Sequence, residues 1–267
     1  MNPSFSKEAA FIEQLLVGAS QMIPGISAKQ DFAVVTKEDH TPVTDIDHKV
    51  EAYFRTELVR TFPDDTILGE EEGGEVSREG RSWVFDPLDG TRNFVRRIPH
   101  VASGIVFLSK GKPVASGVYL VDEKRVLIAQ RGSGVWTRPL LQKNWEQVTL
   151  PRPSERLAIV SFTRGRTLGQ SKFVLRALDA LLPYTFTVRT LGSSLESFAY
   201  FVLGRTDLML CCHTSLWDEL PGQLLALEAG AQMKTVSDQK NQATINFYVH
   251  PDFAAQIDTV IKELKNG

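Results

Sequence analysis

Cysteine is almost absent from this sequence of 267 residues, which contains only Cys211 and Cys212, side by side. Adjacent cysteines cannot join distant parts of a fold, so a structural disulfide between them is not expected. Two reduced thiols in a buried strand are the simpler interpretation. We therefore expect a cytoplasmic protein.

Long hydrophobic runs are also missing. No apolar stretch reaches the roughly 18 residues that a membrane-spanning helix needs. The N-terminal segment carries Lys7, Glu8 and Glu13 within its apolar stretch, so it lacks the uninterrupted core of a signal peptide. We expect neither a signal sequence nor contact with a membrane.

The sequence has no block of one charge sign. Lysine and arginine number 30, aspartate and glutamate 32, and the formal net charge is -2. A nucleic acid is not expected as a partner, because binding its phosphate backbone needs a positive surface. A mildly acidic protein that binds phosphorylated molecules must take local positive charge from a few side chains, helix termini or metal ions.

The hydrophobic content of 42% allows a sizeable core, in one large domain or two small ones. Apolar residues at helical spacing predict a helix after Ser6 and another after Thr44, where Thr44 and Asp47 have the spacing of a capping box. Short apolar runs between residues 83 and 136 predict an antiparallel meander, because their connections are short and polar.

The remainder of the chain alternates between the two kinds of pattern. The proline-rich segment 138–155 is interpreted as the crossing between two halves, residues 1–147 and 148–267. Strands are predicted at 159–162, 185–190 and 207–212, and helices at 170–182, 195–204 and 251–264. A further helix is predicted to carry Leu220, Leu224 and Leu227 and to end before Gly230. The pattern indicates an α/β (α+β) protein in which helices are layered on two sheets.

The string WVFDPLDGTRNF, residues 83–94, carries the most specific chemistry. An apolar run delivers Asp86 and Asp89 into what reads as a tight turn, where both carboxylates can point inward as oxygen ligands for a hard cation. Gly90 lets the backbone approach an oxyanion closely, and a helix that begins near Thr91 would offer free N–H groups. Asp-Gly alone would indicate only a turn, whereas the whole string favours a metal site.

Two further acidic segments accompany it. Glu70, Glu71 and Glu72 follow a short apolar run, and such a group is either solvated or needs a nearby cation. Asp218 precedes Pro221, so it is interpreted as the N-cap of a helix. This is compatible with a role as a metal ligand, because a capping position also lies at a helix mouth.

Together these segments resemble the inositol monophosphatase family, within the wider superfamily of lithium-sensitive, Mg2+-dependent phosphatases. The resemblance extends from about Thr41 to Ala231. It rests on the strings TPVTDID (41–47), GEE (69–71), DPLDGT (86–91) with the following NF, RTLGSSLESFAY (189–200), and WD (217–218) before a helix that ends in EAGA. It implies the layered αβαβα sandwich of the inositol monophosphatase and fructose-1,6-bisphosphatase type. It also implies a homodimer and inhibition by Li+.

The resemblance implies two or three Mg2+ ions. Glu70, Asp86 and the main-chain carbonyl of Leu88 would bind one ion. Asp86, Asp89 and Asp218 would bind a second ion, with Asp86 bridging the two. Glu70 would also help to hold a third ion through water.

The same resemblance implies the catalytic and substrate-binding residues. Gly90 and Thr91 would contact phosphate. Thr91, with Glu70 and Asp47 nearby, would orient the attacking water and help to deprotonate it. The residues that would contact the rest of the substrate are Gly192, Ser193, Ser194 and Asp218. Lys37 is the candidate for the lysine that a flexible loop of the family carries near the third metal.

One departure from the family pattern affects the substrate. Inositol-specific members have a glutamate seven residues before the aspartate of the WD pair, and this chain has Cys211 there. A thiol cannot replace a carboxylate as the acceptor for sugar hydroxyls. Three substrate classes stay open: polyol phosphates including inositol phosphate, histidinol phosphate, and 3',5'-bisphosphorylated adenosine nucleotides. A protein of this fold that acts by binding a macromolecular partner is the alternative from another class.

Three arginines, Arg92, Arg96 and Arg97, follow the DGT string. They are interpreted either as a solvated helix face or as a group that attracts an anionic substrate. His48 is expected to be exposed on the helix after Asp47, and His100 is expected to have no clustered partner.

Overall fold

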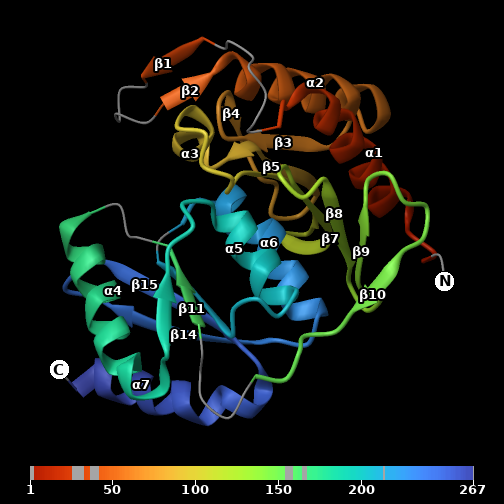
Figure 1. The fold of residues 1–267 in the computed structure, drawn as a ribbon. Coiled ribbons are helices and arrows are strands. Elements are labelled where there is room, and N and C mark those ends of the chain that lie inside the picture. The colour runs from red at the N-terminus through yellow and green to blue at the C-terminus, as the bar shows by residue number, and fades with distance from the viewer. Residues whose placement is uncertain are drawn as a thin grey trace.

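The computed structural model describes residues 3–25, 33–36, 42–153, 159–163, 167–212 and 214–266. Helices and sheets alternate in five layers, as Figure 1 shows from α1 and α2 at the top to α4 and α7 at the bottom. The α-helices are α1 (Lys7–Met22), α2 (Asp45–Thr61), α3 (Thr91–Val95), α4 (Leu168–Leu181), α5 (Ser194–Val202), α6 (Leu216–Glu228) and α7 (Ala254–Asn266). In the described ranges, two 3-10 helices cover Leu182–Tyr184 and Pro251–Phe253.

The first two helices begin where their capping residues predict. The Ser6 side chain accepts a hydrogen bond from Ala9 N (3.2 Å), and α1 starts at the next residue. At the start of α2, Asp47 Oδ2 accepts from Thr44 N (2.8 Å) while the Thr44 hydroxyl accepts from the N–H of Asp47 (3.4 Å). The predicted capping box is therefore confirmed.

The larger sheet has eight strands within the described residues, in the order β10-β9-β8-β7-β6-β5-β3-β4. Strands β5 to β10 form an antiparallel meander, which was predicted between residues 83 and 136 but not as far as β10, and β3 pairs in parallel with β5. Its strands are β3 (Thr66–Gly69), β4 (Gly73–Gly74), β5 (Arg81–Asp89), β6 (Ala102–Ser109), β7 (Lys112–Leu120), β8 (Arg125–Gln130), β9 (Gly134–Pro139) and β10 (Glu146–Val148). A short ribbon of β1 (Val34–Thr36) and β2 (Pro42–Thr44) precedes α2.

The smaller sheet has five strands within the described residues, in the order β12-β11-β13-β15-β14. Its strands are β11 (Ile159–Phe162), β12 (Thr187–Arg189), β13 (Leu208–Cys212), β14 (Gln232–Asp238) and β15 (Ala243–Val249). The first three agree with the predicted strands, whereas the β14–β15 hairpin is not predicted by the sequence pattern.

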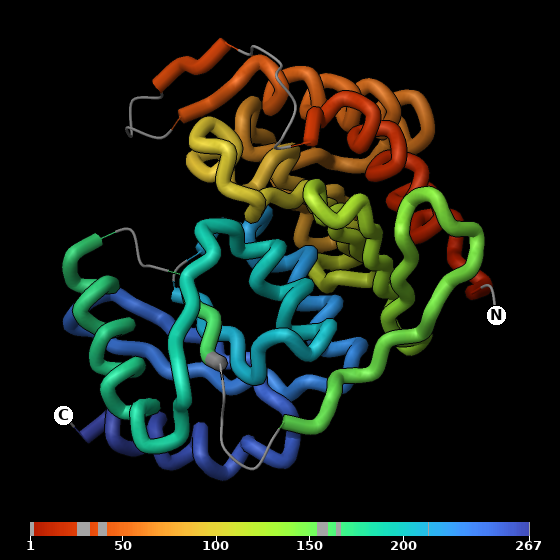
Figure 2. The backbone as a smooth tube through the Cα atoms, in the orientation of Figure 1, coloured from red at the N-terminus to blue at the C-terminus, as the bar shows by residue number. Residues whose placement is uncertain are grey.

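The segment 138–155 is not a simple crossing. Its first part contains the end of β9 and the whole of β10, which extend the larger sheet to Val148. Figure 2 shows the chain leaving β10 and running along the side of the molecule toward the second half. This edge strand has no signal in the sequence, because it is three residues long and mostly exposed, so it lacks an apolar alternation.

Helices α5 and α6 fill the space between the two sheets. Their apolar residues form one buried cluster with Ala102 and Val118 of the larger sheet and with Met209, Cys211 and Tyr248 of the smaller one. α1 and α2 cover the other face of the larger sheet, and α4 and α7 cover the other face of the smaller sheet. The predicted αβαβα layering is confirmed. No helix in the described part of the chain is long and apolar enough to cross a membrane.

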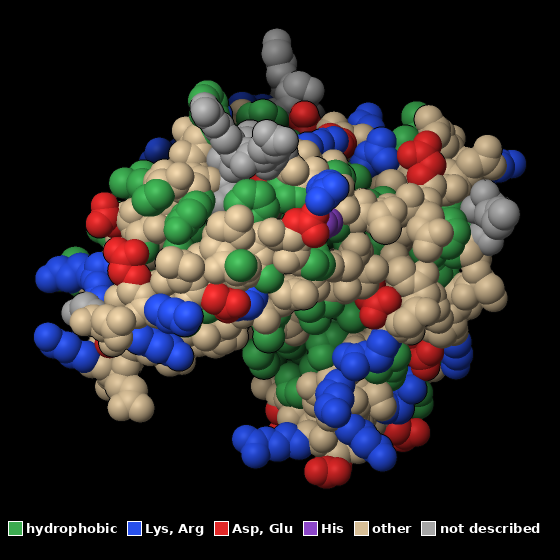
Figure 3. Space-filling model, turned by 90° about the horizontal axis from the view of Figure 1, so that it is seen from below, with side chains coloured by type: hydrophobic (Ala, Val, Ile, Leu, Met, Phe, Trp, Pro, Cys, Tyr) green, Lys and Arg blue, Asp and Glu red, His purple; other side chains and the backbone are tan. Residues whose placement is uncertain are grey.

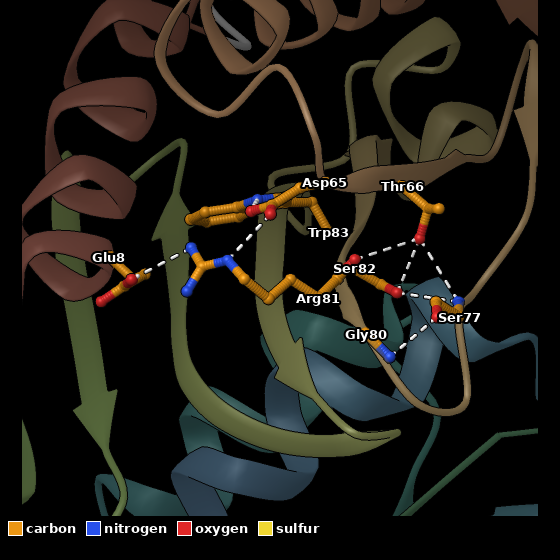
Figure 4. Close-up of polar contacts among 8 residues, drawn as sticks. All are labelled: Glu8, Asp65, Thr66, Ser77, Gly80, Arg81, Ser82 and Trp83. Atoms are coloured by element: carbon orange, nitrogen blue, oxygen red, sulfur yellow. Dashed lines mark hydrogen bonds and ion pairs between the residues drawn. The ribbon is translucent and has the colours of Figure 1, made fainter.

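A polar network fastens the beginning of β5 (Figure 4). Arg81 donates from Nε to Asp65 Oδ1 (2.8 Å) and from Nη2 to Glu8 Oε1 of α1 (3.1 Å). The indole N–H of Trp83 donates to Asp65 Oδ2 (2.8 Å). Because Trp83 is fully buried, this bond satisfies a donor that water cannot reach.

The same end of the sheet fixes the register of β3 against β5. Thr66 lies opposite Ser82, and their hydroxyl oxygens are 2.7 Å apart. Because the two strands are parallel, the same register continued to their carboxyl ends brings Glu70, which follows β3, beside Asp86 of β5.

Charges on the surface are interspersed. On the face shown in Figure 3, lysine and arginine side chains lie among aspartate, glutamate and apolar ones. Local groups of charge therefore matter more than the small net charge of the chain.

Candidate active site

The two aspartates of the DPLDG string face the same side of β5 because the strand contains an extra residue. Asp86 lies opposite Gly104 of β6 and Asp89 lies opposite Ala102, so three steps along β5 match two along β6. Side chains three apart in a regular strand point to opposite faces, and a bulge corrects this. Ala102 packs with α5 and α6, so both carboxylates face these helices. The predicted tight turn is thus a bulge inside the strand, which continues to Asp89.

Glu70 reaches the same edge from the end of β3. Its loop is held by Glu51 of α2, which is fully buried. Glu51 accepts hydrogen bonds from Glu71 N (2.9 Å) and Glu72 N (3.0 Å), and it pairs with Arg55 through Nε (2.9 Å). The buried carboxylate therefore fixes the backbone directly after Glu70.

Asp218 approaches from the opposite side, on α6. The N-cap of this helix is Ser215, and Asp218 is the third residue, where its Oδ2 accepts from Ser215 N (3.3 Å). The prediction that Asp218 is the N-cap is therefore wrong, and Pro221 lies in the second turn rather than the first. Ser215 and Asp218 have the spacing of a capping box, in which the serine is the N-cap and the acid is the third residue of the helix.

Glu70, Asp86 and Asp218 each offer a carboxylate oxygen, and these oxygens lie within 4.8 Å of one another. Burial raises the pKa of Asp86 well above its ordinary value, and the negative charges of Glu70 and Asp89 raise it further. Crowded carboxylates of this kind need a counter-charge, and oxygen donors are those that Mg2+ prefers. The donor set therefore fits a hard divalent cation.

Asp89 lies beside this set and is held by the start of α5. Its Oδ2 accepts from Ser193 Oγ (2.7 Å) and from Leu195 N (2.6 Å). Burial raises the pKa of Asp89 well above its ordinary value, as does the charge of Asp218, while the two hydrogen bonds lower it. Ser193 is also the N-cap of α5, so the helix N-terminus favours a negative charge at Asp89.

Thr91 joins the cluster to α2. Its hydroxyl lies 3.1 Å from Asp47 Oδ1 and 3.0 Å from the carbonyl oxygen of Leu88. A hydroxyl has one hydrogen, so it donates to one of these acceptors at a time. Asp47 is buried, and its other oxygen is occupied by the capping box of α2. The structure therefore brings Asp47, Leu88 and Thr91 together.

Two glycines let separate loops approach each other next to Thr91. Gly90 has φ +92° and Gly192 has φ +77°, which L side chains rarely adopt. A Cβ on Gly90 would lie 2.7 Å from the carbonyl oxygen of His100, and one on Gly192 would lie 2.9 Å from Asn93 Nδ2. Asn93 Nδ2 donates to the carbonyls of His100 (2.8 Å) and Leu191 (2.7 Å), which fastens the loops together.

Two predicted site residues remain, Ser194 and Lys37. Ser194 is half-buried at the first position of α5. Lys37 lies outside the described residues. His48 is exposed, as expected. His100 does have a partner, contrary to expectation, because its Nδ1 lies 3.2 Å from Glu196 Oε1. The two residues are 96 positions apart in the sequence, so no local pattern predicts this contact.

Cys211 is buried and faces the layer of α5 and α6, while Cys212 faces the opposite side of the sheet. Both thiols are free, as predicted. Burial raises the pKa of the Cys211 thiol well above its ordinary value, so it stays neutral. The neighbouring carboxylate, Glu219, accepts from Tyr248 Oη (2.5 Å) and Asn246 Nδ2 (2.7 Å).

Sequence reasoning missed Glu51 and Asn93 as residues that position the site. Glu51 had a signal, because it lies on the apolar stripe of α2 with Val50 and Phe54, where an acid is unexpected. Asn93 was read only as part of a motif. Its two carbonyl partners lie in loops that the sequence cannot place together.

Comparison with known proteins agrees with this geometry. A histidinol-phosphatase of Mycobacterium tuberculosis is 33% identical over 212 residues, which cover 77% of this chain and 78% of the relative. A protein named Nus factor SuhB from Xylella fastidiosa is 30% identical over 205 residues, 77% of this chain and 73% of the relative. The solved structure of the extragenic suppressor protein SuhB from Bartonella henselae superimposes with a TM-score of 0.80, at 25% identity, over 98% of this chain and all of that one.

The family model agrees with the motifs and with the fold. The model described as the inositol monophosphatase family matches residues 6–262, which include every carboxylate of the cluster. The chain therefore belongs to the inositol monophosphatase family.

Proposed function

We propose that this protein is a Mg2+-dependent phosphatase that hydrolyses a small phosphomonoester. The observation that carries the proposal is the acidic cluster, in which oxygens of Glu70, Asp86 and Asp218 lie within 4.8 Å of one another. The similarity to a histidinol-phosphatase supports the same reaction class.

Five residues would hold two or three Mg2+ ions: Glu70, Asp86, Leu88 through its carbonyl, Asp89 and Asp218. The Leu88 carbonyl has two lone pairs, so it can bind a cation while it accepts from the Thr91 hydroxyl. When bound, Mg2+ would offset the repulsion between the carboxylates and a phosphate dianion, acidify water and stabilise the leaving oxygen.

Thr91, Asp47 and Glu70 would act on the attacking water. Thr91 Oγ1 lies within hydrogen-bonding distance of Asp47, so a water that donates to Thr91 can pass its proton along a short path to a buried carboxylate. Burial raises the pKa of Asp47, which makes it a better proton acceptor than an exposed aspartate. Gly90 and Thr91 would bind the phosphate group.

The alcohol part of the substrate would lie against Gly192, Ser193 and Ser194. The Ser193 hydroxyl already donates to Asp89, so its first role is to hold that carboxylate. Cys211 offers no charged acceptor for ring hydroxyls, which disfavours inositol phosphate as the preferred substrate. Histidinol phosphate and 3',5'-bisphosphorylated adenosine remain candidates.

The proposal is tested by phosphate release from a panel of phosphomonoesters, with and without Mg2+. The panel holds inositol-1-phosphate, histidinol phosphate, fructose-1,6-bisphosphate, 3'-phosphoadenosine-5'-phosphate and 2'-AMP. We expect Mg2+-dependent release, with one substrate far ahead of the others, and inhibition by Li+. The absence of Mg2+-dependent release from every compound would count against the proposal.

A second candidate function is the binding of a macromolecular partner, which the similarity to a protein named Nus factor favours. A pure binding protein has no need for carboxylates crowded enough to raise one another's pKa, which favours catalysis. Recovery of a partner by a protein that lacks turnover would favour binding. A homodimer and a cytoplasmic location stay predictions.

A further inference from the structure

The outer face of α3 carries a pair of arginines beside a surface pocket. Arg92 is the second residue of α3, and Arg96 is its C-cap, whose N–H donates to the carbonyl oxygen of Arg92 (3.3 Å). The two arginines are therefore one helical turn apart, and both are exposed. Together with Pro42 and Val95 they line a pocket of about 340 Å3. Both arginines therefore border one concavity.

The described part of the chain offers neither arginine a counter-charge. Within the described residues, no hydrogen bond or ion pair is made by the side chain of Arg92 or Arg96, whereas Arg55, Arg81 and Arg138 each contact a carboxylate. Like charges at this spacing in a helix repel each other. An anion in the pocket would relieve that repulsion.

Two residues of the pocket are connected along the chain to the segments that carry the proposed catalytic residues. Arg92 directly follows Thr91, and Pro42 begins β2, which runs into the start of α2 and so to Asp47. Thr91 and Asp47 are in hydrogen-bonding contact at 3.1 Å. α3 packs against β2 in the structure, and Figure 1 shows them side by side. The pocket therefore adjoins the two segments that carry Thr91 and Asp47.

We propose that Arg92 and Arg96 form a second anion site, which binds an oxyanion group of the substrate other than the phosphate that is hydrolysed. The planar guanidinium fork matches the geometry of phosphate and carboxylate groups. This inference rests on the proposed phosphatase function and narrows it. The preferred substrate carries a second phosphate or a carboxylate in addition to the scissile phosphomonoester.

The experiment compares substrates that differ only in the second anion. The pairs are 3'-phosphoadenosine-5'-phosphate with 3'-AMP, fructose-1,6-bisphosphate with fructose-1-phosphate, and 3-phosphoglycerate with glycerol-3-phosphate. The first two pairs test a second phosphate, and the third tests a carboxylate. We expect the wild type to prefer the member with the second anion in at least one pair, and the preference to weaken with added salt.

The arginines are then replaced singly and together by Arg92→Gln and Arg96→Gln. The double variant should raise KM for the preferred doubly anionic substrate by about five- to tenfold, and leave KM for its singly anionic partner within about twofold. Arg152→Gln is the matched control, because it also removes one positive charge from an exposed arginine. Arg152 pairs with Asp252, and both residues are far along the chain from α3. Arg152→Gln should change neither constant.

Equal changes for both members of each pair, or no preference in the wild type, would overturn the inference while leaving the proposed function intact. A wild type that releases no phosphate would instead contradict the proposed function. Calorimetric titration with 3'-phosphoadenosine-5'-phosphate and fructose-1,6-bisphosphate in the presence of Mg2+ then decides the anion site by itself. Weaker binding of either compound by the double variant than by the wild type would support the site. If the wild type and the double variant bind each compound with equal affinity, the inference is overturned.

Discussion

The substitution Asp89→Asn removes one negative charge from the carboxylate cluster but keeps the hydrogen bonds that this side chain accepts. Both hydrogen bonds to this carboxylate, from Ser193 and Leu195, end on the same oxygen, Oδ2. The single oxygen of asparagine can accept both, while its amide group takes the place of the other carboxylate oxygen. The variant should therefore keep the local structure and lose only the negative charge.

The expected effects on stability have opposite signs with and without metal. Without metal, burial and Asp218 raise the pKa of Asp89, and each unit above the ordinary value costs the folded state about 1.4 kcal/mol near neutral pH. Asp89→Asn should remove this cost and raise the midpoint of thermal unfolding. With Mg2+ at a hundredfold excess over its Kd, the wild type should gain about 2.7 kcal/mol. That corresponds to roughly 5–8 °C in a protein of this size.

Thermal unfolding in EDTA and in Mg2+ measures both effects. Asp89→Asn should lose most of the Mg2+-induced shift. Ser193→Ala is the matched control, because it removes one hydrogen bond to Asp89 and the N-cap of α5 but leaves the charge in place. It should lower stability by about 1–2 kcal/mol and keep the Mg2+ shift. A full Mg2+ shift in Asp89→Asn, or none in the wild type, would refute the metal assignment.

Three further predictions concern single residues. Thr91→Val should lower kcat for phosphate release about 100-fold or more while the Mg2+-induced thermal shift persists, and near-normal turnover would exclude Thr91 from the reaction. Glu51→Gln should loosen the loop after Glu70 and raise the Mg2+ concentration for half-maximal activity about tenfold, which an unchanged Mg2+ titration would disprove. Burial raises the pKa of Glu196 to about 8, so the folded state holds a proton that the unfolded chain releases above pH 4.5. Wild-type stability in EDTA should therefore fall between pH 4.5 and 8, and Glu196→Gln should flatten this fall by up to about 1.4 kcal/mol per pH unit in urea unfolding. Parallel stability profiles of the wild type and Glu196→Gln against pH would contradict the role of Glu196.

Much of the fold could be predicted because local signals agree with the tertiary structure. Ser6 and Thr44 mark helix starts through their own side chains, and the apolar runs of the meander are separated by short polar turns. The β14–β15 hairpin was not predicted. β14 is an edge strand whose residues are mostly exposed, so it has no apolar alternation to identify it.

The site was predictable in composition but not in geometry. Asp86 and Asp89 could be recognised from the sequence, whereas the bulge that turns them to one face depends on their pairing with β6. The position of Asp218 in its helix depends on which residue, Ser215 or Asp218, caps it, and both fit the local pattern. Contacts between distant segments, such as that of Asn93 with Leu191, have no signature in one sequence.

The central claim is that the carboxylate cluster hydrolyses a phosphomonoester with the help of Mg2+. The most direct measurement is phosphate release from the best substrate of the panel as a function of Mg2+ concentration, in the wild type and in Asp218→Asn. We predict no release without metal, saturable activation by Mg2+ in the wild type, and at most a trace of turnover in the variant, which stays folded. Release that is independent of Mg2+, or near-wild-type turnover in Asp218→Asn, would contradict the account.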